Sequence, residues 1–336
     1  MSGRLLRWLL SLWPRSSRSV PRLTIVRHHR VYDDRERPLY RLGVSASVLE
    51  SQLRALSVAG LAPLTVSEGL ARLAESRTGH WVAMSFDDGY ADNVSRALPL
   101  LKAAGARATF YLTAGWIDAR RPAWWDELAY ALEHARVPEC RWTSDQGRVV
   151  SLRLATPRDR ADSLRKLLPE MRVPTEARAR SLKRLREATA AAGEAPCEFA
   201  DWSEAARLLE AGMEIGAHTL THPHLSLLDP AGQRREIEGS IRLIESRLGS
   251  PPTGFAYPGG DLDERSVAIV RDARLVHAVT TSRGDVTPGA DRLRLPRRGL
   301  SEGACLGPTG VFSTRLTLAE VRGAFDGLRS RVEAAA

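Results

Sequence analysis

The chain has 336 residues, enough for one large domain or two small ones with a substantial buried core. Hydrophobic residues make up 43% and charged residues 26%, ordinary values for a globular protein that exclude wholesale disorder. The formal net charge is +9, but only three of the 49 basic residues are lysines and the arginines are scattered among acidic residues. We therefore expect no nucleic-acid partner, while some attraction to anionic surfaces or glycans stays open.

Residues 1–20 form a basic, amphipathic N-terminal segment. Its apolar run from Leu5 to Trp13 is interrupted by an arginine, is too short to span a bilayer, and is followed by no A-x-A cleavage site. Two alternatives remain open: an interfacial helix over residues 4–13, and a frayed basic leader. The three cysteines form no CxxC pair, which favours a reducing compartment. We expect a cytoplasmic protein, with residues 4–13 offering peripheral contact to the inner membrane.

Beyond residue 20, short apolar strands alternate with amphipathic helices. Helix ends are recognisable at Asp229 and Gly249, which delimit one helix, and at a capping box formed by Asp201 and Glu204. About seven strand–helix alternations predict a parallel barrel or a doubly wound sheet. The expected strands are 23–28, 81–86, 107–113, 213–218, 253–257, 277–281 and 293–296.

One arginine-rich stretch interrupts this alternation between the third and fourth strands, over about residues 126–200. Its pattern is helical and is broken by prolines. We interpret it as a helical insertion, or lid, on a single domain that spans residues 21–336 and has its core at about residues 80–300.

Two polar clusters follow strands of the expected sheet. In VAMSFDDGYAD, residues 82–92, an apolar run ends in Asp87 and Asp88. A turn or a helix cap would explain such a pair equally well. In EIGAHTLTHPHL, residues 214–225, His218 and His222 lie four residues apart. In a helical turn, that spacing places both imidazoles on one face, as two ligands of one metal require.

The combination of the two clusters is far more specific than either alone. Two histidines and one carboxylate form a facial set of ligands for a divalent metal, with positions left open for water and substrate. The remaining aspartate could then act as general base on an acidified water molecule.

SFDDGYAD (85–92), HTLTHPHL (218–225) and FAYPGG (255–260) resemble the first three signature motifs of the polysaccharide deacetylases, the NodB-homology group of carbohydrate esterase family 4. The resemblance covers about residues 21–300. It implies a distorted (β/α)7-type barrel and metal-dependent hydrolysis of an N-acetyl group on an N-acetylhexosamine glycan. It also implies a metal that is most often zinc, with cobalt as an alternative.

Carried over by position, the resemblance implies a general base, three metal ligands and an oxyanion donor. The base would be Asp87, and the ligands would be Asp88, His218 and His222. A backbone N–H in the third motif would stabilise the oxyanion, so the candidate substrate contacts there are Tyr257, Pro258 and Gly259.

This sequence departs from the family pattern at the third motif. The arginine that orients the base in many members is missing, and Arg297 or Arg298 could replace it; Arg297 is also a candidate substrate contact. Gly259 takes the place of an aromatic residue. Trp116, after the third strand, is a candidate sugar contact near the cleft.

The Leu-x-His signature that supplies the general acid is not recognisable either. His29, at the end of the first strand, is the alternative, as acid or substrate contact. His28 is expected to pack or to face solvent, His277 to be a packed histidine, and His224 to be a surface residue.

Three functions are open. The first is an N-deacetylase acting on a polysaccharide or glycan precursor, and the second is a deacylase of a small amide or ester. The third, a non-catalytic glycan-binding relative, is suggested by the departures from the family pattern, but a base beside three metal ligands has no purpose in a protein that only binds.

Overall fold

The computed structural model describes residues 20–326, so the interfacial segment expected at residues 4–13 lies outside the described residues. No helix within residues 20–326 combines the length and the apolar character needed to cross a membrane.

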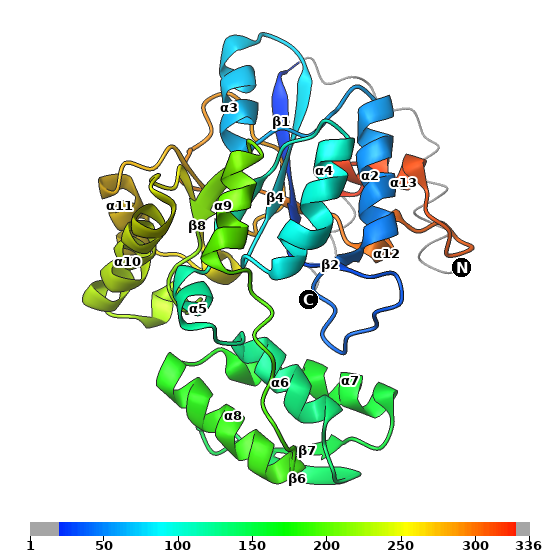
Figure 1. Ribbon diagram of the computed structural model, residues 1–336, viewed down its shortest axis with the longest axis vertical. Helices are drawn as coiled ribbons and strands as arrows, with labels where there is room; N and C mark the ends of the chain where they lie inside the picture. The colour runs from blue at the N-terminus through cyan, green and yellow to red at the C-terminus, as the bar shows by residue number, and fades with distance from the viewer. Residues whose placement is uncertain (1–19, 327–336) are drawn as a thin grey trace.

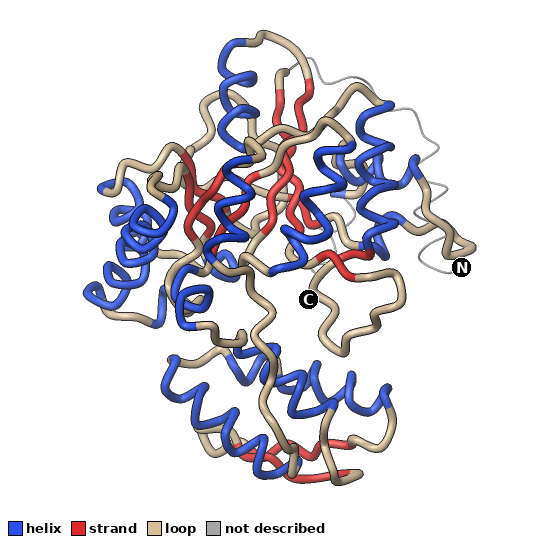
Figure 2. Tube along the Cα trace, in the orientation of Figure 1, coloured by secondary structure: helices blue, strands red, loops and turns tan. Residues whose placement is uncertain are grey.

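Seven parallel strands form the central sheet, in the order β10-β9-β8-β5-β4-β1-β11. Helices surround the strands, and the sheet curls into a (β/α)-barrel-like fold (Figures 1 and 2). The expected alternation of strands and helices is confirmed. The strands are β1 (Arg22–His28), β4 (His80–Phe86), β5 (Thr109–Leu112), β8 (Glu214–Ala217), β9 (Gly254–Ala256), β10 (His277–Val279) and β11 (Arg298–Gly299).

The last strand is not where the sequence placed it. Residues 293–296 form only an isolated bridge, between Leu295 and Val279 of β10, and β11 follows two residues beyond them. Pro296 has no N–H and cannot continue a ladder there. Arg298 then pairs with Val26 of β1, so one segment contacts both edges of the sheet.

Helices with clear end signals cover the sheet. Asp229 caps α10 by accepting from the Gly232 N–H at 2.6 Å, and Gly249 ends it with φ = 67°, as predicted. The capping box of Asp201 and Glu204 at α9 is confirmed too. These helices are α2 (Ala46–Val58), α3 (Val66–Glu75), α4 (Leu98–Ala103), α5 (Ala114–Ala119), α9 (Trp202–Glu210), α10 (Pro230–Leu248), α11 (Glu264–Asp272), α12 (Glu302–Cys305) and α13 (Thr314–Val321).

The remaining short elements link these units. They are the paired strands β2 (Val31–Tyr32) and β3 (Val44–Ser45), the π-helical turn η1 (Asn93–Ala97) that leads into α4, and the 3₁₀ turns η2 (Pro169–Met171), η3 (Leu225–Leu227) and η4 (Pro258–Gly260).

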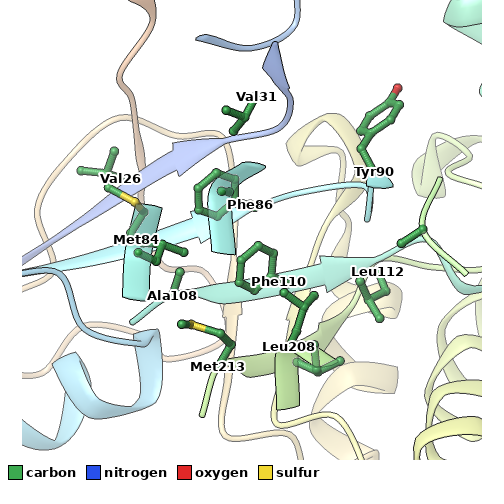
Figure 3. Packing of buried hydrophobic residues seen from close by; sticks show 14 of the residues in the cluster. Val26, Val31, Met84, Phe86, Tyr90, Ala108, Phe110, Leu112, Leu208 and Met213 are labelled. Carbon is green, nitrogen blue, oxygen red and sulfur yellow. The ribbon is translucent and has the colours of Figure 1, made fainter. Parts of the chain in front are cut away.

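Buried apolar side chains of adjacent strands form the main core. Met84 and Phe86 of β4 lie beside Phe110 of β5, and the Phe86 and Phe110 rings stack 5.0 Å apart (Figure 3). These strands are buried on both faces over most of their length, which accounts for their largely apolar sequences. The polar residues that follow them are thereby held on a rigid frame.

The stretch expected to be a helical insertion is only partly helical. It contains α6 (Trp124–Glu133), α7 (Pro157–Leu167) and α8 (Thr175–Thr189), together with an antiparallel hairpin of β6 (Glu139–Thr143) and β7 (Val149–Arg153). In the hairpin, Trp142 and Leu152 are buried between exposed neighbours, a strand periodicity that the many arginines obscured. These elements share a separate apolar cluster and form their own layer beyond α5 (Figure 1).

His28 makes the fold sensitive to acid. It packs inside, stacked on Phe86 with ring centroids 5.4 Å apart, and burial lowers its pKa from 6.5 to about 3. The unfolded chain therefore takes up a proton below pH 6.5 that the folded protein resists, so stability falls as the pH drops from 6.5 towards 4.

Between pH 6.5 and 4, the free energy of unfolding should fall by about 2 kcal/mol less in His28→Phe than in the wild type. The reason is that phenylalanine keeps the stacking on Phe86 but does not titrate. Urea unfolding at a series of pH values measures this difference. Equal pH slopes in the two proteins would contradict it.

Candidate active site

The first part of the site is the turn that follows β4. Asp88 has φ = 77° and Gly89 has φ = 88°, so the chain leaves the strand in a sharp left-handed turn. Asp88 is only 1% exposed, and neither of its carboxylate oxygens has a hydrogen-bond partner among the described residues. Burying a carboxylate without a partner costs free energy, so we expect a cation to bind here.

Two imidazoles from the loop after β8 face that carboxylate. The Nε2 atoms of His218 and His222 lie 3.5 Å and 3.8 Å from Asp88 Oδ1. Ligands of a tetrahedral zinc, each about 2.1 Å from the ion, lie about 3.4 Å from one another. The three side chains expected to hold the metal are thus brought together, with their ligand atoms all within 4.8 Å of one another, and their donor set suits a divalent metal.

The tautomer of His218 fits the same role. Its Nδ1 lies 2.6 Å from the carbonyl oxygen of Ala256. Because a carbonyl can only accept, Nδ1 carries the proton, and the Nε2 lone pair is left for a metal.

The loop that brings the two histidines together is not helical, contrary to the sequence prediction. Thr219 and His222 both have positive φ, 65° and 51°. Glu236 of α10 holds the loop, because its carboxylate accepts from the N–H groups of Leu220 and Thr221, each at 2.9 Å. The two imidazoles are therefore positioned by a strained loop, and Glu236 of α10 holds this loop in place.

We expect Glu236→Gln to weaken metal binding about tenfold, because a neutral amide holds the two N–H groups less well and frees the His222 loop. Metal affinity measured by competition with a chromogenic chelator tests this. Glu238→Gln, on the exposed part of the same helix, is the matched control and should bind metal as wild type does. Equal affinities in all three proteins would show that the loop needs no such support.

The other aspartate of the pair has a cationic partner. Arg297 binds Asp87 through two parallel hydrogen bonds, Nη1 to Oδ1 at 2.6 Å and Nη2 to Oδ2 at 2.7 Å. Burial would raise the pKa of Asp87, but the charge and hydrogen bonds of Arg297 outweigh it and hold this pKa well below its usual range. Asp87 is therefore an anion at neutral pH.

Of the two arginines considered for this position, Arg297 is thus the one that contacts Asp87. Its Nε also donates to the Thr280 carbonyl oxygen at 2.9 Å, and its side chain is 1% exposed, so it lies behind Asp87 and not against a substrate. Arg298 instead pairs with Asp285 and Asp326.

Two further histidines, His29 and His224, line a cavity beside this centre. His29 Nε2 is 3.9 Å from Asp87 Oδ2, and burial lowers the pKa of His29 to about 4. His224, expected at the surface, is half-buried and lines the same cavity. His277 lies inside the barrel, with Nε2 2.8 Å from Tyr111 Oη.

A cavity of about 480 Å³ opens over the two aspartates and His29. One wall comes from the stretch between β5 and β8, through Leu168, Pro169 and Arg172. Tyr40, Trp124 and Thr281 also line it. The sequence favoured packing of Trp124 onto the barrel, with sugar stacking as the alternative, and gave no role to Tyr40 or Thr281.

The third motif contributes less than expected. Tyr257 is fully buried, and its N–H donates to the Val279 carbonyl oxygen at 3.1 Å as part of the sheet. Pro258 is buried and has no N–H. Gly259 alone of the three lines the cavity, with φ = 61° and no hydrogen bond from its N–H to any described residue.

Trp116 is also displaced from the expected cleft. It is 8% exposed and stacks on His222, with ring centroids 5.8 Å apart. Trp125 contacts the same imidazole edge-on at 4.7 Å. Both tryptophans therefore pack behind the second histidine and fix its ring.

Comparison with protein families matches residues 74–278 to the family described as polysaccharide deacetylase. Chitin deacetylase 1 of Cryptococcus neoformans var. grubii is 34% identical over 74 residues, which is 22% of this chain and 16% of that relative. The chain thus matches only about a sixth of that protein's length.

Solved structures share the fold. The deacetylase PplD of Streptococcus pyogenes superimposes with a TM-score of 0.58 and 17% identity, over 89% of this chain and 98% of that one. IcaB of Ammonifex degensii gives a TM-score of 0.53 and 18% identity, over 82% of this chain and 90% of that one. The BpsB deacetylase domain of Bordetella bronchiseptica gives 0.53 and 14%, over 86% and 98%.

Proposed function

Since this chain belongs to the polysaccharide deacetylase family, we propose that it is a metal-dependent hydrolase that removes N-acetyl groups from an N-acetylhexosamine-containing polysaccharide or glycan precursor. The observation that carries the proposal is an ionised Asp87 beside the buried group of Asp88, His218 and His222. A hydrolytic site needs both a base and an electrophile, and these residues supply the places for both.

The metal would be held by Asp88, His218 and His222, and most often such a donor set holds zinc, with cobalt as an alternative. A divalent metal there would polarise the acetamide carbonyl and acidify a water molecule. The low pKa of Asp87 fits this requirement, because so acidic a carboxylate is too weak a base for ordinary water.

In this proposal, Asp87, Gly259 and His29 each have a separate role in the reaction. Asp87 takes a proton from the attacking water, whose oxygen bonds to the acetamide carbon. The Gly259 N–H, which lines the cavity and is not used by the sheet, would donate to the oxygen that becomes negative. His29 Nε2 lies 3.9 Å from Asp87 Oδ2, and in this proposal His29 relays the proton taken up by Asp87 to the leaving amine as the C–N bond breaks. The products are acetate and a free amino sugar.

The deciding experiment measures acetate release from N-acetylglucosamine, from its oligomers of two to five units and from phenyl acetate, before and after chelation and after zinc is restored. We expect release that chelation abolishes and zinc restores. Release from phenyl acetate or N-acetylglucosamine alone, with none from oligomers, would favour the small-substrate deacylase. Metal and glycan binding without any turnover would favour the binding protein instead.

We also propose a cytoplasmic location with peripheral contact to the inner membrane through residues 4–13, supported by the basic, tryptophan-containing sequence of that segment. Cell fractionation of the full chain tests this, and recovery in the periplasm would overturn it.

A further inference from the structure

A second and larger cavity, of about 840 Å³, lies between α5, α6 and α8. It adjoins the site just described, because Trp124 lines both cavities and Thr221, next to His222, lines this one. Trp116, which stacks on His222, also forms part of its wall. One extended molecule could therefore occupy both cavities.

Arg178 of α8 lines this cavity and is 3% exposed. Its Nε donates to the Met171 carbonyl oxygen at 3.1 Å and one Nη2 hydrogen to that of Val173 at 3.2 Å, while the guanidinium lies 4.8 Å above the Trp124 ring. The described residues offer its Nη1 no acceptor, and this atom is not among the fully buried ones, so it reaches the space of the cavity.

No carboxylate within residues 20–326 pairs with Arg178, whose pKa responds to burial alone. Burial lowers its pKa to about 10, so the side chain still carries its charge at neutral pH. A buried cation normally has an anionic partner, because two carbonyls and a ring face compensate only part of the lost hydration. The missing partner points to a ligand.

The surroundings of Arg178 favour an anion as well. Lys183, five residues further along α8, lines the exposed rim of the same cavity. Two acidic residues, Glu127 and Glu187, line the cavity too. Burial raises the pKa of Glu127, although the charges of Arg121 and Arg186 act in the other direction. Because four basic side chains line the cavity against two acidic ones, its net charge is positive.

We propose that this cavity binds an acidic substituent of the glycan, carried on a sugar beyond the one that is deacetylated, with Arg178 as its principal contact and Lys183 beside it. The inference rests on the proposed function and narrows its substrate class to anionic glycans. The substituent is a carboxylate or a phosphate, both of which match the paired donors of a guanidinium.

The alternative is that Arg178 only ties η2 to α8 through the two carbonyls. Such a structural role would make every ligand bind worse when Arg178 is changed. If Arg178 binds the ligand, changing it should reduce the affinity for acidic glycans and leave the affinity for neutral ones. A general loosening of the helix would not alter this ratio of affinities.

Calorimetry with the metal-loaded full chain separates these outcomes. The probes are a hyaluronan tetrasaccharide, which carries carboxylates, UDP-N-acetylglucosamine, which carries phosphates, and the neutral N-acetylglucosamine tetramer. We expect at least one acidic probe to bind about tenfold more tightly than the neutral tetramer at low salt, with the preference reduced by added salt. The identity of that probe tells carboxylate from phosphate.

Arg178→Met should remove this preference and leave the affinity for the neutral tetramer within about twofold. Arg178→Lys should keep part of it, and Arg180→Met, which removes an exposed arginine from the same helix, should change nothing. If Arg178→Met does not fold, Lys183→Glu at the rim of the cavity provides the test, since it should abolish the preference by repulsion.

Equal affinities of wild type for all three probes would overturn the inference, as would an equal loss of all affinities in Arg178→Met. Neither result depends on turnover. If the protein prefers acidic glycans but releases no acetate, only the proposed function is contradicted. If it releases acetate from neutral oligomers and shows no preference for acidic glycans, only this inference is contradicted.

Discussion

Asp87→Asn is expected to slow acetate release by about 10²–10⁴-fold while the protein still binds one zinc ion. The amide has nearly the shape of the carboxylate but cannot accept a proton. The metal ligands are other residues, namely Asp88, His218 and His222. The loss of activity would therefore come from the missing proton transfer and not from loss of the metal. Zinc stoichiometry and acetate release measured on the same preparation give both numbers.

The matched control is Asp88→Asn, one residue away in the same turn. It should lose zinc together with activity, because it removes the only charged member of the ligand group. The assignment of the two aspartates would be reversed if Asp87→Asn lost the metal and Asp88→Asn kept it.

Arg297→Met is expected to lower the free energy of unfolding by about 3–5 kcal/mol, because it leaves the Asp87 carboxylate buried without its cation. Burial would then raise the pKa of Asp87, which Arg297 now holds below its usual range. As a result, the acid limb of the pH–activity profile should move to higher pH. Urea unfolding and acetate release across the pH range measure the two effects.

A double-mutant cycle separates the pair from its parts. Each single variant, Asp87→Asn or Arg297→Met, leaves one buried charge unmatched, whereas the double variant leaves none and should be more stable than the two losses added together. Arg54→Met, which breaks an exposed pair with Glu50, is the control and should cost less than about 1 kcal/mol. Strict additivity of the two core variants would show that they do not act as a pair.

The sequence predicted the fold well because its signals are local. The strands that lead to the aspartates and to His218 are short apolar runs, and the ends of α9 and α10 follow from single capping residues. The motifs also predicted which side chains gather at one end of the sheet, since parallel strands end at the same edge. Family resemblance supplied the expected roles of those residues, and these roles stay proposals.

What the sequence could not predict depends on contacts between distant segments. Either Arg297 or Arg298 could have reached Asp87, and only the course of the chain across both sheet edges selects Arg297. Nothing local shows that the Tyr257 N–H is used by the sheet and the Gly259 N–H is not. Likewise, the aromatic side chain of Trp116 suggested a sugar contact, but its packing on His222 is visible only in three dimensions.

The most direct test of the account titrates zinc into chelated protein and follows acetate release from N-acetylglucosamine oligomers at each step. We predict that release rises linearly and reaches its plateau at one zinc per chain, because Asp88, His218 and His222 form one ligand group. Release that does not depend on zinc, or a single zinc bound with no release from any oligomer, would contradict the account.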